Sequence, residues 1–269
     1  MSQIGFLLDL EGTLVKDKSY TPFEEALKFT EKLDKLNIPW IVATNNSTEK
    51  PYELINILKD KGFNVNEKKL LSPSSMAIET LKKEEIKSIY FLGTEKIKEF
   101  FRENGIEVKE DYQVNAVVVG RDKNVDFKKL KTATSALVIN KAKLFSYHMN
   151  RIILDKDGLV SPSVGAIATC LSYAGNCDIT SFGKPSKLYF ERAFELLGIK
   201  NPENVFMVSD DPFSDLAGGK KAVGFKTVFV LSGKYKNTDI LETIEPELRP
   251  DFIFQHIGKC EKLIEGKEW

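Results

Sequence analysis

Residues 4–14 read IGFLLDLEGTL, and this stretch decides the fold. Five residues that are apolar or glycine run directly into Asp9, Glu11 and Gly12. A short apolar run bounded by glycine is typical of a strand buried on both faces, as in a parallel sheet. The acids would then lie at the carboxyl edge of that sheet, which is where open parallel sheets bind their ligands.

The residues that follow alternate between helical and extended patterns. Residues 21–24 (TPFE) have the composition of a capping box with proline at the first helical position, and apolar spacing carries that helix to Asn37. A strand over 39–43 and a helix over 51–61 come next, and Ser72 caps a further helix before proline. This β-α-β-α order predicts right-handed crossovers and a doubly wound parallel sheet of the Rossmann-like α/β class.

The alternation restarts near residue 89 and returns to its first form in the last third of the chain. The middle part is expected to hold strands over 89–92, 116–119 and 143–147, and helices over 95–104, 126–136 and 162–173, the last capped by Ser161. The last third is expected to hold helices over 187–197 and 257–264, and strands over 205–209 and 226–231. We therefore expect a core domain of residues 1–79 and 179–269 with a second α/β domain, residues 80–178, inserted into it.

Charge and cysteine content argue against several classes of protein. The 39 basic residues balance 39 acidic ones, so neither nucleic acid nor a membrane surface is expected as the main partner. No stretch approaches the roughly 18 apolar residues that span a bilayer. Acids interrupt the only apolar run near the N-terminus, so no signal peptide and a cytoplasmic location are expected. The three cysteines lack the spacing of a metal site.

Several expected strands end in groups that suit phosphate chemistry. The first strand ends in Asp9 and Glu11, and the second in Thr44 and Asn45. The strand over 205–209 is followed by Asp210, Asp211 and Asp215. Lys184 lies just before the helix over 187–197, which precedes that strand. Carboxylates suit a hard cation such as Mg²⁺, and a lysine supplies fixed positive charge. Phosphoryl transfer depends mainly on such positioning and charge, and a carboxylate can act as its nucleophile.

Four motifs, in order, resemble those of the haloacid dehalogenase superfamily. The first, DLEGTL (9–14), resembles the pattern Asp-x-Asp-Gly-Thr/Val-Leu, and the second, TNNS (44–47), has the form found in the NagD-like 4-nitrophenylphosphatase branch. The third is GKP (183–185). The fourth, VSD (208–210) with Asp215, resembles Val-Gly-Asp-x4-Asp. The long gap between residues 47 and 183 matches that branch, which inserts a large α/β cap there. PSVGAI (162–167) resembles its Pro-x-x-Gly-x-Ile stretch late in the cap.

The resemblance implies a phosphatase that depends on Mg²⁺ and has Asp9 as its nucleophile. Asp9, Asp210 and the backbone carbonyl of Glu11 would bind the metal. Thr44 and the Asn45 backbone amide would bind phosphate, Lys184 would balance the charge, and Asp215, with Asp211 nearby, would support Lys184 or metal-bound water.

The chain departs from the family pattern at three places. Glu11 stands where family phosphatases have an aspartate that protonates the leaving oxygen and later activates water. We favour a working phosphatase in which Glu11 does this. The alternative is a catalytically weakened phospho-ligand-binding or sensor protein. Ser209 replaces a usual glycine and is expected to be tolerated. In the cap, Asn150 replaces a usual aspartate, and it and His148 are candidates for contact with the leaving group, unless His148 is simply a satisfied structural residue.

Other chemistries fit less well. The acid at position 11 and the metal-binding Asp210 belong to phosphate chemistry rather than to halide displacement. Dinucleotide binding is disfavoured because no Gly-x-Gly-x-x-Gly follows the first strand. The expected substrate is a small phosphorylated metabolite, with sugar phosphates, phosphoglycolate, nucleotides and pyridoxal phosphate all open. The resemblance also implies a homodimer formed through the cap.

Overall fold

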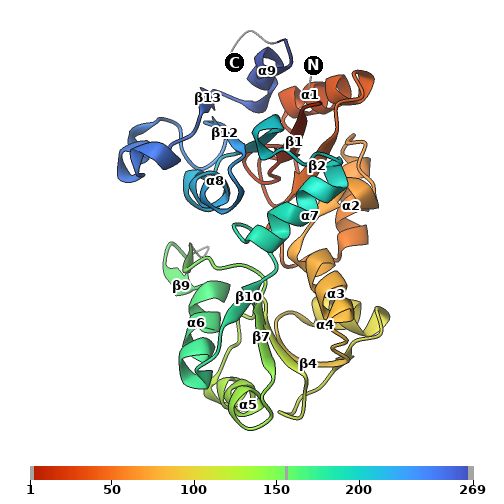
Figure 1. The fold of residues 1–269 in the computed structure, drawn as a ribbon, viewed down its shortest axis with the longest axis vertical. Coiled ribbons are helices and arrows are strands. Elements are labelled where there is room, and N and C mark those ends of the chain that lie inside the picture. Colours follow the sequence, from red (N-terminus) through yellow and green to blue (C-terminus); the bar gives the residue numbers. More distant parts are fainter. Residues whose placement is uncertain (1–2, 155–156, 266–269) are drawn as a thin grey trace. The chain divides into compact units, whose positions relative to one another are not determined.

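The structure, a computed structural model, describes residues 3–154 and 157–265 and forms two compact units (Figure 1). The first unit contains the chain up to Thr44, Tyr52–Leu71, and the chain from Lys184 onward. The second contains Asn45–Pro51 and Ser72–Gly183. The second unit therefore begins eight residues before the boundary expected at 79/80 and ends five residues after the one expected at 178/179, and it also takes in Asn45–Pro51, which the sequence assigned to the core domain.

A parallel sheet of six strands forms the centre of the first unit. In spatial order the strands are β13 (Phe252–Phe254), β12 (Lys226–Val230), β11 (Val205–Ser209), β1 (Gly5–Leu8), β2 (Trp40–Ala43) and β3 (Leu70–Leu71). Every pairing in it is parallel. The order of the strands reverses between β1 and β11, which makes this the switch point of a doubly wound sheet.

The central strands of this sheet are buried on both faces. All residues of β1, β2 and β11 are buried, as the short apolar runs predicted. On one face Phe6 packs against Phe29 of α1 (Glu24–Lys35) and Phe206, with ring centroids 5.4 Å apart in both pairs. On the other face lies α7 (Lys187–Leu197), which contacts β1 and β2 and buries Tyr189 and Phe190.

The helices of the first unit confirm most of the expected segments. They are α1 (Glu24–Lys35), α2 (Pro51–Asp60), α7 (Lys187–Leu197), α8 (Gly219–Val223) and α9 (Glu261–Ile264). The capping box expected at residues 21–24 is wrong, because Phe23 occupies the N-cap position and makes no side-chain cap bond. Instead Pro22 forms a bridge with Val15, and the Lys16 N–H donates to the Thr21 carbonyl at 2.8 Å. These contacts keep residues 21 and 22 extended, so the helix begins only at Glu24.

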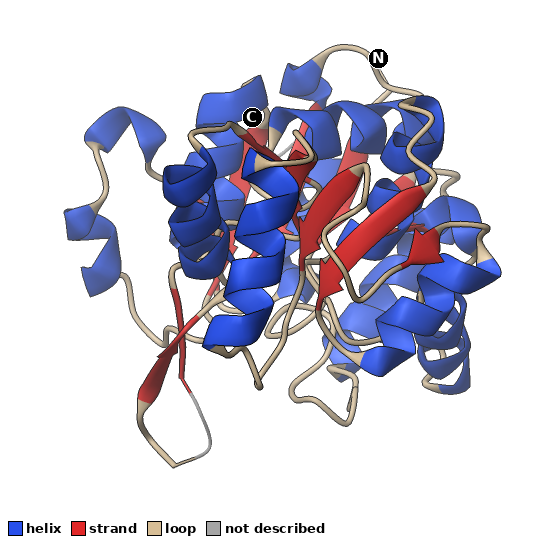
Figure 2. Cartoon of the chain, turned by 90° about the horizontal axis from the view of Figure 1, so that it is seen from below, coloured by secondary structure: helices blue, strands red, loops and turns tan. Residues whose placement is uncertain are grey.

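The second unit has a parallel sheet and a separate antiparallel hairpin. The sheet consists of β10 (Ile179–Ser181), β7 (Lys143–Ser146), β6 (Ala116–Val119), β4 (Ser88–Leu92) and β5 (Glu107–Val108), in that order. The hairpin pairs β8 (Ile152–Leu154) with β9 (Val160–Pro162), and Figure 2 shows it as a narrow ribbon. The helices are α3 (Pro73–Lys83), α4 (Glu95–Glu103), α5 (Phe127–Val138) and α6 (Val164–Gly175).

The hairpin also explains a second wrong helix start. The sequence predicted a helix from residue 162 with Ser161 as its cap, but Ser161 and Pro162 belong to β9. Ser163 takes the N-cap position of α6 without a side-chain cap bond. Strands of three residues are too short for an alternating pattern to reveal them. By contrast, the Ser72 cap of α3 is confirmed, with the Ser75 N–H donating to Ser72 Oγ at 3.3 Å.

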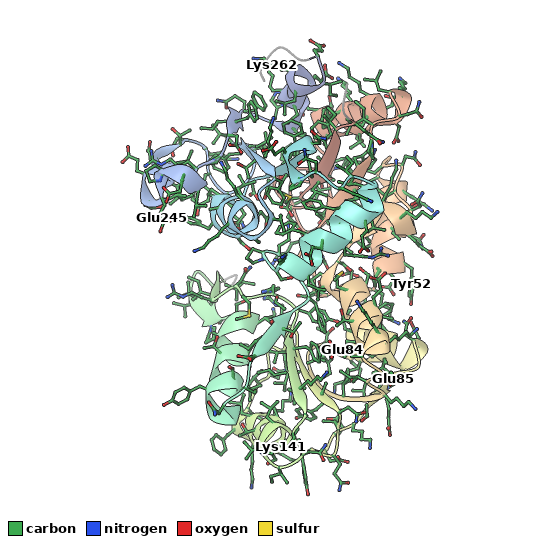
Figure 3. The ribbon with its side chains drawn as sticks, in the orientation of Figure 1. Tyr52, Glu84, Glu85, Lys141, Glu245 and Lys262 are labelled. Carbon is green, nitrogen blue, oxygen red and sulfur yellow. The ribbon has the colours of Figure 1, made fainter. Side chains whose placement is uncertain are left out.

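The surface carries dispersed charge. Glu84, Glu85 and Lys141 of the second unit are exposed, and their labelled side chains lie at its edge in Figure 3. Lys82 and Lys83 are exposed as well, which agrees with a solvated helix face. Within residues 3–154 and 157–265, none of the helices has the length and apolar character needed to cross a bilayer.

Candidate active site

The switch point of the first sheet brings two of the predicted acids together. Strands β1 and β11 pair in parallel with Leu8 opposite Val208, and the Asp9 N–H donates to the Val208 carbonyl at 2.9 Å. Asp9 and Asp210 therefore follow the carboxyl ends of neighbouring strands. Both are almost fully buried, at 8% and 2% exposure. This is the position in an open parallel sheet where ligands bind.

Lys184 joins Asp9 to a third acid. Its Nζ donates to Asp9 Oδ1 at 2.7 Å and to Asp215 Oδ2 at 2.6 Å. The lysine side chain is 1% exposed. Burial by itself would lower the pKa of Lys184, but the carboxylates of Asp215 and Asp9 outweigh it and raise that pKa. The ammonium therefore stays charged beside the Asp9 carboxylate.

Asp215 lies on an irregular helical turn, Pro212–Gly218, directly after β11. Its Oδ2 accepts from Ser209 Oγ at 2.7 Å in addition to Lys184. Ser209 Oγ in turn accepts from the Asp211 N–H at 3.0 Å. Burial raises the pKa of Asp215 to about 7, while Lys184 acts in the opposite direction. Because the Asp215 Oδ2 accepts hydrogen bonds from both Ser209 and Lys184, these contacts favour the ionised carboxylate.

The Asp210 carboxylate lies directly against two glycines, Gly12 and Gly233. A Cβ on Gly12 or on Gly233 would overlap the Asp210 carboxylate, and Gly12 also has φ +79°. Oδ2 of Asp210 accepts from the Lys234 N–H at 2.7 Å. Oδ1 is buried, and no donor in the described part of the chain reaches it. An acceptor left unpaired in a buried site is what a metal ligand would be before its metal binds.

The charge balance around Asp9 also fits a cation. Burial raises the pKa of Asp9 to about 6; Lys184 lowers it, while Asp210 and Glu11 raise it again through their negative charge. A bound cation would relieve this repulsion and keep Asp9 ionised. In residues 3–154 and 157–265, no three His, Cys, Asp or Glu side chains are grouped so that they could hold a metal by themselves. The expected set of two carboxylates, a backbone carbonyl and water is of the kind that Mg²⁺ accepts.

Asp211 has a structural position. Its Oδ1 accepts from the N–H groups of Phe213 and Ser214 at 3.0 and 2.9 Å, which caps the turn that carries Asp215. Its Oδ2 pairs with Lys234 Nζ at 2.8 Å. Asp211 thus connects this turn to the loop after β12.

Thr44 and Glu11 complete the first unit's share of the predicted residues. Thr44 follows β2 and is fully buried, and its carbonyl accepts from the Tyr189 hydroxyl at 3.3 Å. Glu11 follows β1, forms a bridge with Val15 and is partly exposed. Its negative charge contributes to the raised pKa of Asp9.

The other predicted substrate contacts belong to the second unit. Asn45 Oδ1 lies against Gly183, where a Cβ would have no room. His148 is 7% exposed, and its Nδ1 accepts from the Asn150 N–H at 3.3 Å. Burial, with a smaller effect of Arg121, lowers the pKa of His148 to about 4. The ring is therefore neutral near pH 7.

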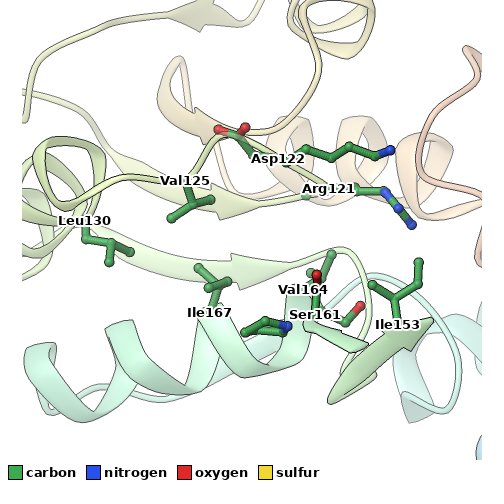
Figure 4. A pocket seen from close by; sticks show the side chains of 12 residues that line it. Arg121, Asp122, Val125, Leu130, Ile153, Ser161, Val164 and Ile167 are labelled. Carbon is green, nitrogen blue, oxygen red and sulfur yellow. The ribbon is translucent and has the colours of Figure 1, made fainter. Parts of the chain in front are cut away.

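The second unit also contains a hollow of about 570 Å³ between the loop after β6, the β8–β9 hairpin and the start of α6 (Figure 4). Val125, Leu130 and Ile167 give it an apolar wall, and Arg121 and Asp122 line it as well. Asp122 pairs with Lys129 at 2.7 Å. Neither His148 nor Asn150 lines this hollow.

Sequence reasoning missed three contributors to the site. Ser209 was treated only as a tolerated departure, yet its hydroxyl binds Asp215. Tyr189 donates to the Leu71 carbonyl at 2.7 Å as well as to that of Thr44, but it looks like a core residue of α7. The loop after β12, with Gly233 and Lys234, contacts Asp210. A signal for the loop existed, because a strand was predicted over 226–231 and its polar end lies at the same sheet edge.

Family models of two related kinds match the chain. The model described as haloacid dehalogenase-like hydrolase matches residues 6–107, and one described as HAD-hydrolase-like matches residues 181–260. Together they cover more than half of the chain.

Individual relatives match over nearly their whole length. An acid sugar phosphatase of Staphylococcus saprophyticus is 29% identical over 97% of this chain and 98% of its own. A 5′-nucleotidase of Bacillus subtilis is 26% identical over 90% of this chain and 92% of its own. Among solved structures, a p-nitrophenyl phosphatase from Archaeoglobus fulgidus has a TM-score of 0.85 at 26% identity, covering 99% of this chain and 100% of its own.

Proposed function

Since the chain belongs to the haloacid dehalogenase-like hydrolases and is a phosphatase of their p-nitrophenylphosphatase branch, we propose that Asp9 is its nucleophile and Mg²⁺ its cofactor. The observation that carries the proposal is the placement of Lys184. Its ammonium is held 2.7 Å from Asp9 Oδ1 and 2.6 Å from Asp215 Oδ2, at the switch point of the sheet. A fixed charge beside a carboxylate nucleophile is what an incoming phosphate requires.

The first step would form an aspartyl-phosphate. A carboxylate oxygen of Asp9 forms a bond to phosphorus while the bond from phosphorus to the substrate oxygen breaks. Glu11 donates its proton to that leaving oxygen, and an alcohol is released. Lys184 stabilises the negative charge that develops on the phosphoryl oxygens.

The second step would hydrolyse the intermediate. The Glu11 carboxylate accepts a proton from water as the water oxygen forms a bond to phosphorus. The bond between Asp9 and phosphorus breaks, which releases phosphate and restores the Asp9 carboxylate. Glu11 then holds the proton that the next turnover requires.

Asp9, Asp210 and the backbone carbonyl of Glu11 would hold Mg²⁺. Bound there, the ion would supply positive charge to the phosphate oxygens and keep Asp9 ionised. The unpaired Oδ1 of Asp210 and the raised pKa of Asp9 support this assignment. Thr44 is proposed to bind phosphate, and Asn45, His148 and Asn150 stay predictions as substrate contacts.

The substrate class and surroundings are also proposals. The names of the relatives favour sugar phosphates and nucleoside 5′-monophosphates as the first small phosphorylated metabolites to test. A homodimer through the second unit stays a prediction. It is supported by the exposure of Phe127 (82%) on α5, of Ile139 (66%) directly after that helix, and of Tyr173 (91%) on the adjacent helix α6. A cytoplasmic location stays a prediction from the sequence.

The test is Mg²⁺-dependent release of phosphate from 4-nitrophenyl phosphate by the wild type, Asp9→Asn and Glu11→Asp. Asp60→Asn, at the exposed end of α2, is the control for an acid-to-amide change outside the site. We expect turnover that requires Mg²⁺, disappears in Asp9→Asn and persists in Asp60→Asn. An inert wild type that becomes active as Glu11→Asp would instead favour the weakened phospho-ligand-binding protein.

A further inference from the structure

The hydroxyl of Ser209 has a defined direction. Ser209 ends β11 and is fully buried. Its Oγ accepts from the Asp211 N–H at 3.0 Å and donates to Asp215 Oδ2 at 2.7 Å. A serine hydroxyl has one proton to donate. Since the Asp211 N–H occupies an acceptor site, that proton is directed at Asp215.

Asp215 and Lys184 connect the Ser209 hydroxyl to the proposed nucleophile, Asp9, through hydrogen bonds. Asp215 Oδ2 accepts from both Ser209 and Lys184, and Lys184 also donates to Asp9 Oδ1. Ser209, Asp215, Lys184 and Asp9 thus form one hydrogen-bonded row, with exposures of 0%, 3%, 1% and 8%. In a buried row of this kind each bond strengthens the next, and losing one member affects the others.

We propose that Ser209 is a positioning residue for phosphoryl transfer, because its hydroxyl fixes the Asp215 carboxylate that aims Lys184 at Asp9. This inference rests on the proposed role of Asp9. Without the hydroxyl, the Asp215 carboxylate is free to turn about its side-chain bonds, and the Lys184 ammonium follows it away from Asp9. A displacement of about 1 Å at a reacting group can cost about 100-fold. A partial shift of Lys184 should lower kcat about 10-fold by the same reasoning.

The chain provides a matched control for a purely structural role. Thr227 of β12 is also fully buried, its Oγ1 donates to Asp251 Oδ2 at 2.7 Å, and it accepts from the Asp251 N–H at 3.1 Å. Asp251 pairs with Lys220 at 2.7 Å. This row repeats the hydroxyl, carboxylate and ammonium of the site, but it contains none of the proposed catalytic groups. Thr227→Ala therefore removes the same kind of hydroxyl without touching the site.

The experiment compares Ser209→Ala, Ser209→Cys and Thr227→Ala with the wild type. Cysteine keeps nearly the size of serine but is a weak donor, so it tests the hydrogen bond even where alanine fails to fold. The readouts are kcat with 4-nitrophenyl phosphate, the melting temperature, and the ¹⁵N NMR signal of the buried Lys184 Nζ, assigned by its loss in Lys184→Arg.

We expect both Ser209 variants to lower kcat about 10-fold and to shift the Lys184 signal. Thr227→Ala should lower the melting temperature as Ser209→Ala does, with kcat and the Lys184 signal unchanged. An unmoved Lys184 signal in the Ser209 variants, or an equal loss of kcat in Thr227→Ala, overturns the proposal. A wild type without turnover counts against Asp9 as nucleophile, and the Lys184 signal then still decides the role of Ser209.

Discussion

Replacing Gly233 with alanine should push the loop after β12 away from the Asp210 carboxylate. The added Cβ would lie 2.6 Å from Asp210 Cβ, and closer still to Cγ and Oδ2, whereas ordinary contact begins at 3.4 Å. The two groups must therefore separate by about 0.8 Å or more, an overpacking that typically costs about 1–3 kcal/mol of stability. The hydrogen bond from the Lys234 N–H to Oδ2, now 2.7 Å, would be lost or strongly weakened.

The consequence for catalysis follows from the size of that shift. A proposed metal ligand moved by about 1 Å should lower kcat about 100-fold and weaken metal binding. We would measure kcat with 4-nitrophenyl phosphate as a function of Mg²⁺ concentration, and Mn²⁺ binding by electron paramagnetic resonance. Gly258→Ala is the control, since its Cβ would meet Glu25 and His256 at 3.1 Å, outside the acid cluster. Gly233→Ala with kcat and Mn²⁺ affinity close to those of the wild type would refute the reasoning.

Three further variants test the charges and the core. Lys184→Met leaves Asp9 and Asp215 as buried carboxylates without their cation, which should cost about 3–5 kcal/mol at pH 7. Burial raises the pKa of both carboxylates and Lys184 lowers it, so loss of Lys184 raises both pKa values further and the variant is stabilised when its carboxylates are protonated. Chemical denaturation should show the loss shrinking as pH falls from 7 to 5, and a constant loss would contradict it. Burial lowers the folded-state pKa of His148 from 6.5 to about 4, so its contribution to stability is complete above pH 6.5 and falls by up to about 3 kcal/mol as pH drops toward 4. His148→Gln should flatten the pH dependence of the denaturation midpoint over that range, and an unchanged dependence would contradict this. Phe6→Ala should cost about 3–5 kcal/mol in urea denaturation because Phe6 is fully buried between two rings, and a loss below about 1 kcal/mol would show that the core refills the space.

Most elements of both units were predictable because their signals are local. A run such as residues 4–8 is apolar throughout and is followed by acids and glycine, and that pattern is sufficient for a buried parallel strand. The helix over 187–197, ended by Gly198 at φ +70°, has the same bounds in the structure as in the prediction. Where the predictions failed, at residues 21–24 and at Ser161, a contact made by a neighbouring segment held the chain extended.

The sequence by itself determined which chemical groups follow which strands, and since parallel strands end at one edge, it also indicated that Asp9 and Asp210 would lie at the same edge of the sheet; the pairing of β1 with β11, which makes them neighbours, came from the structure. Only the tertiary structure decided how they are held. The bond from Lys184 to Asp9 spans 175 positions, and the Lys234 N–H reaches Asp210 from a loop 24 positions away. Ser209 looked like a departure to be tolerated, whereas its hydroxyl binds Asp215. Periodicity reports only how each element buries its own face, and hydrogen bonds between elements depend on distances that arise once the strands are packed side by side.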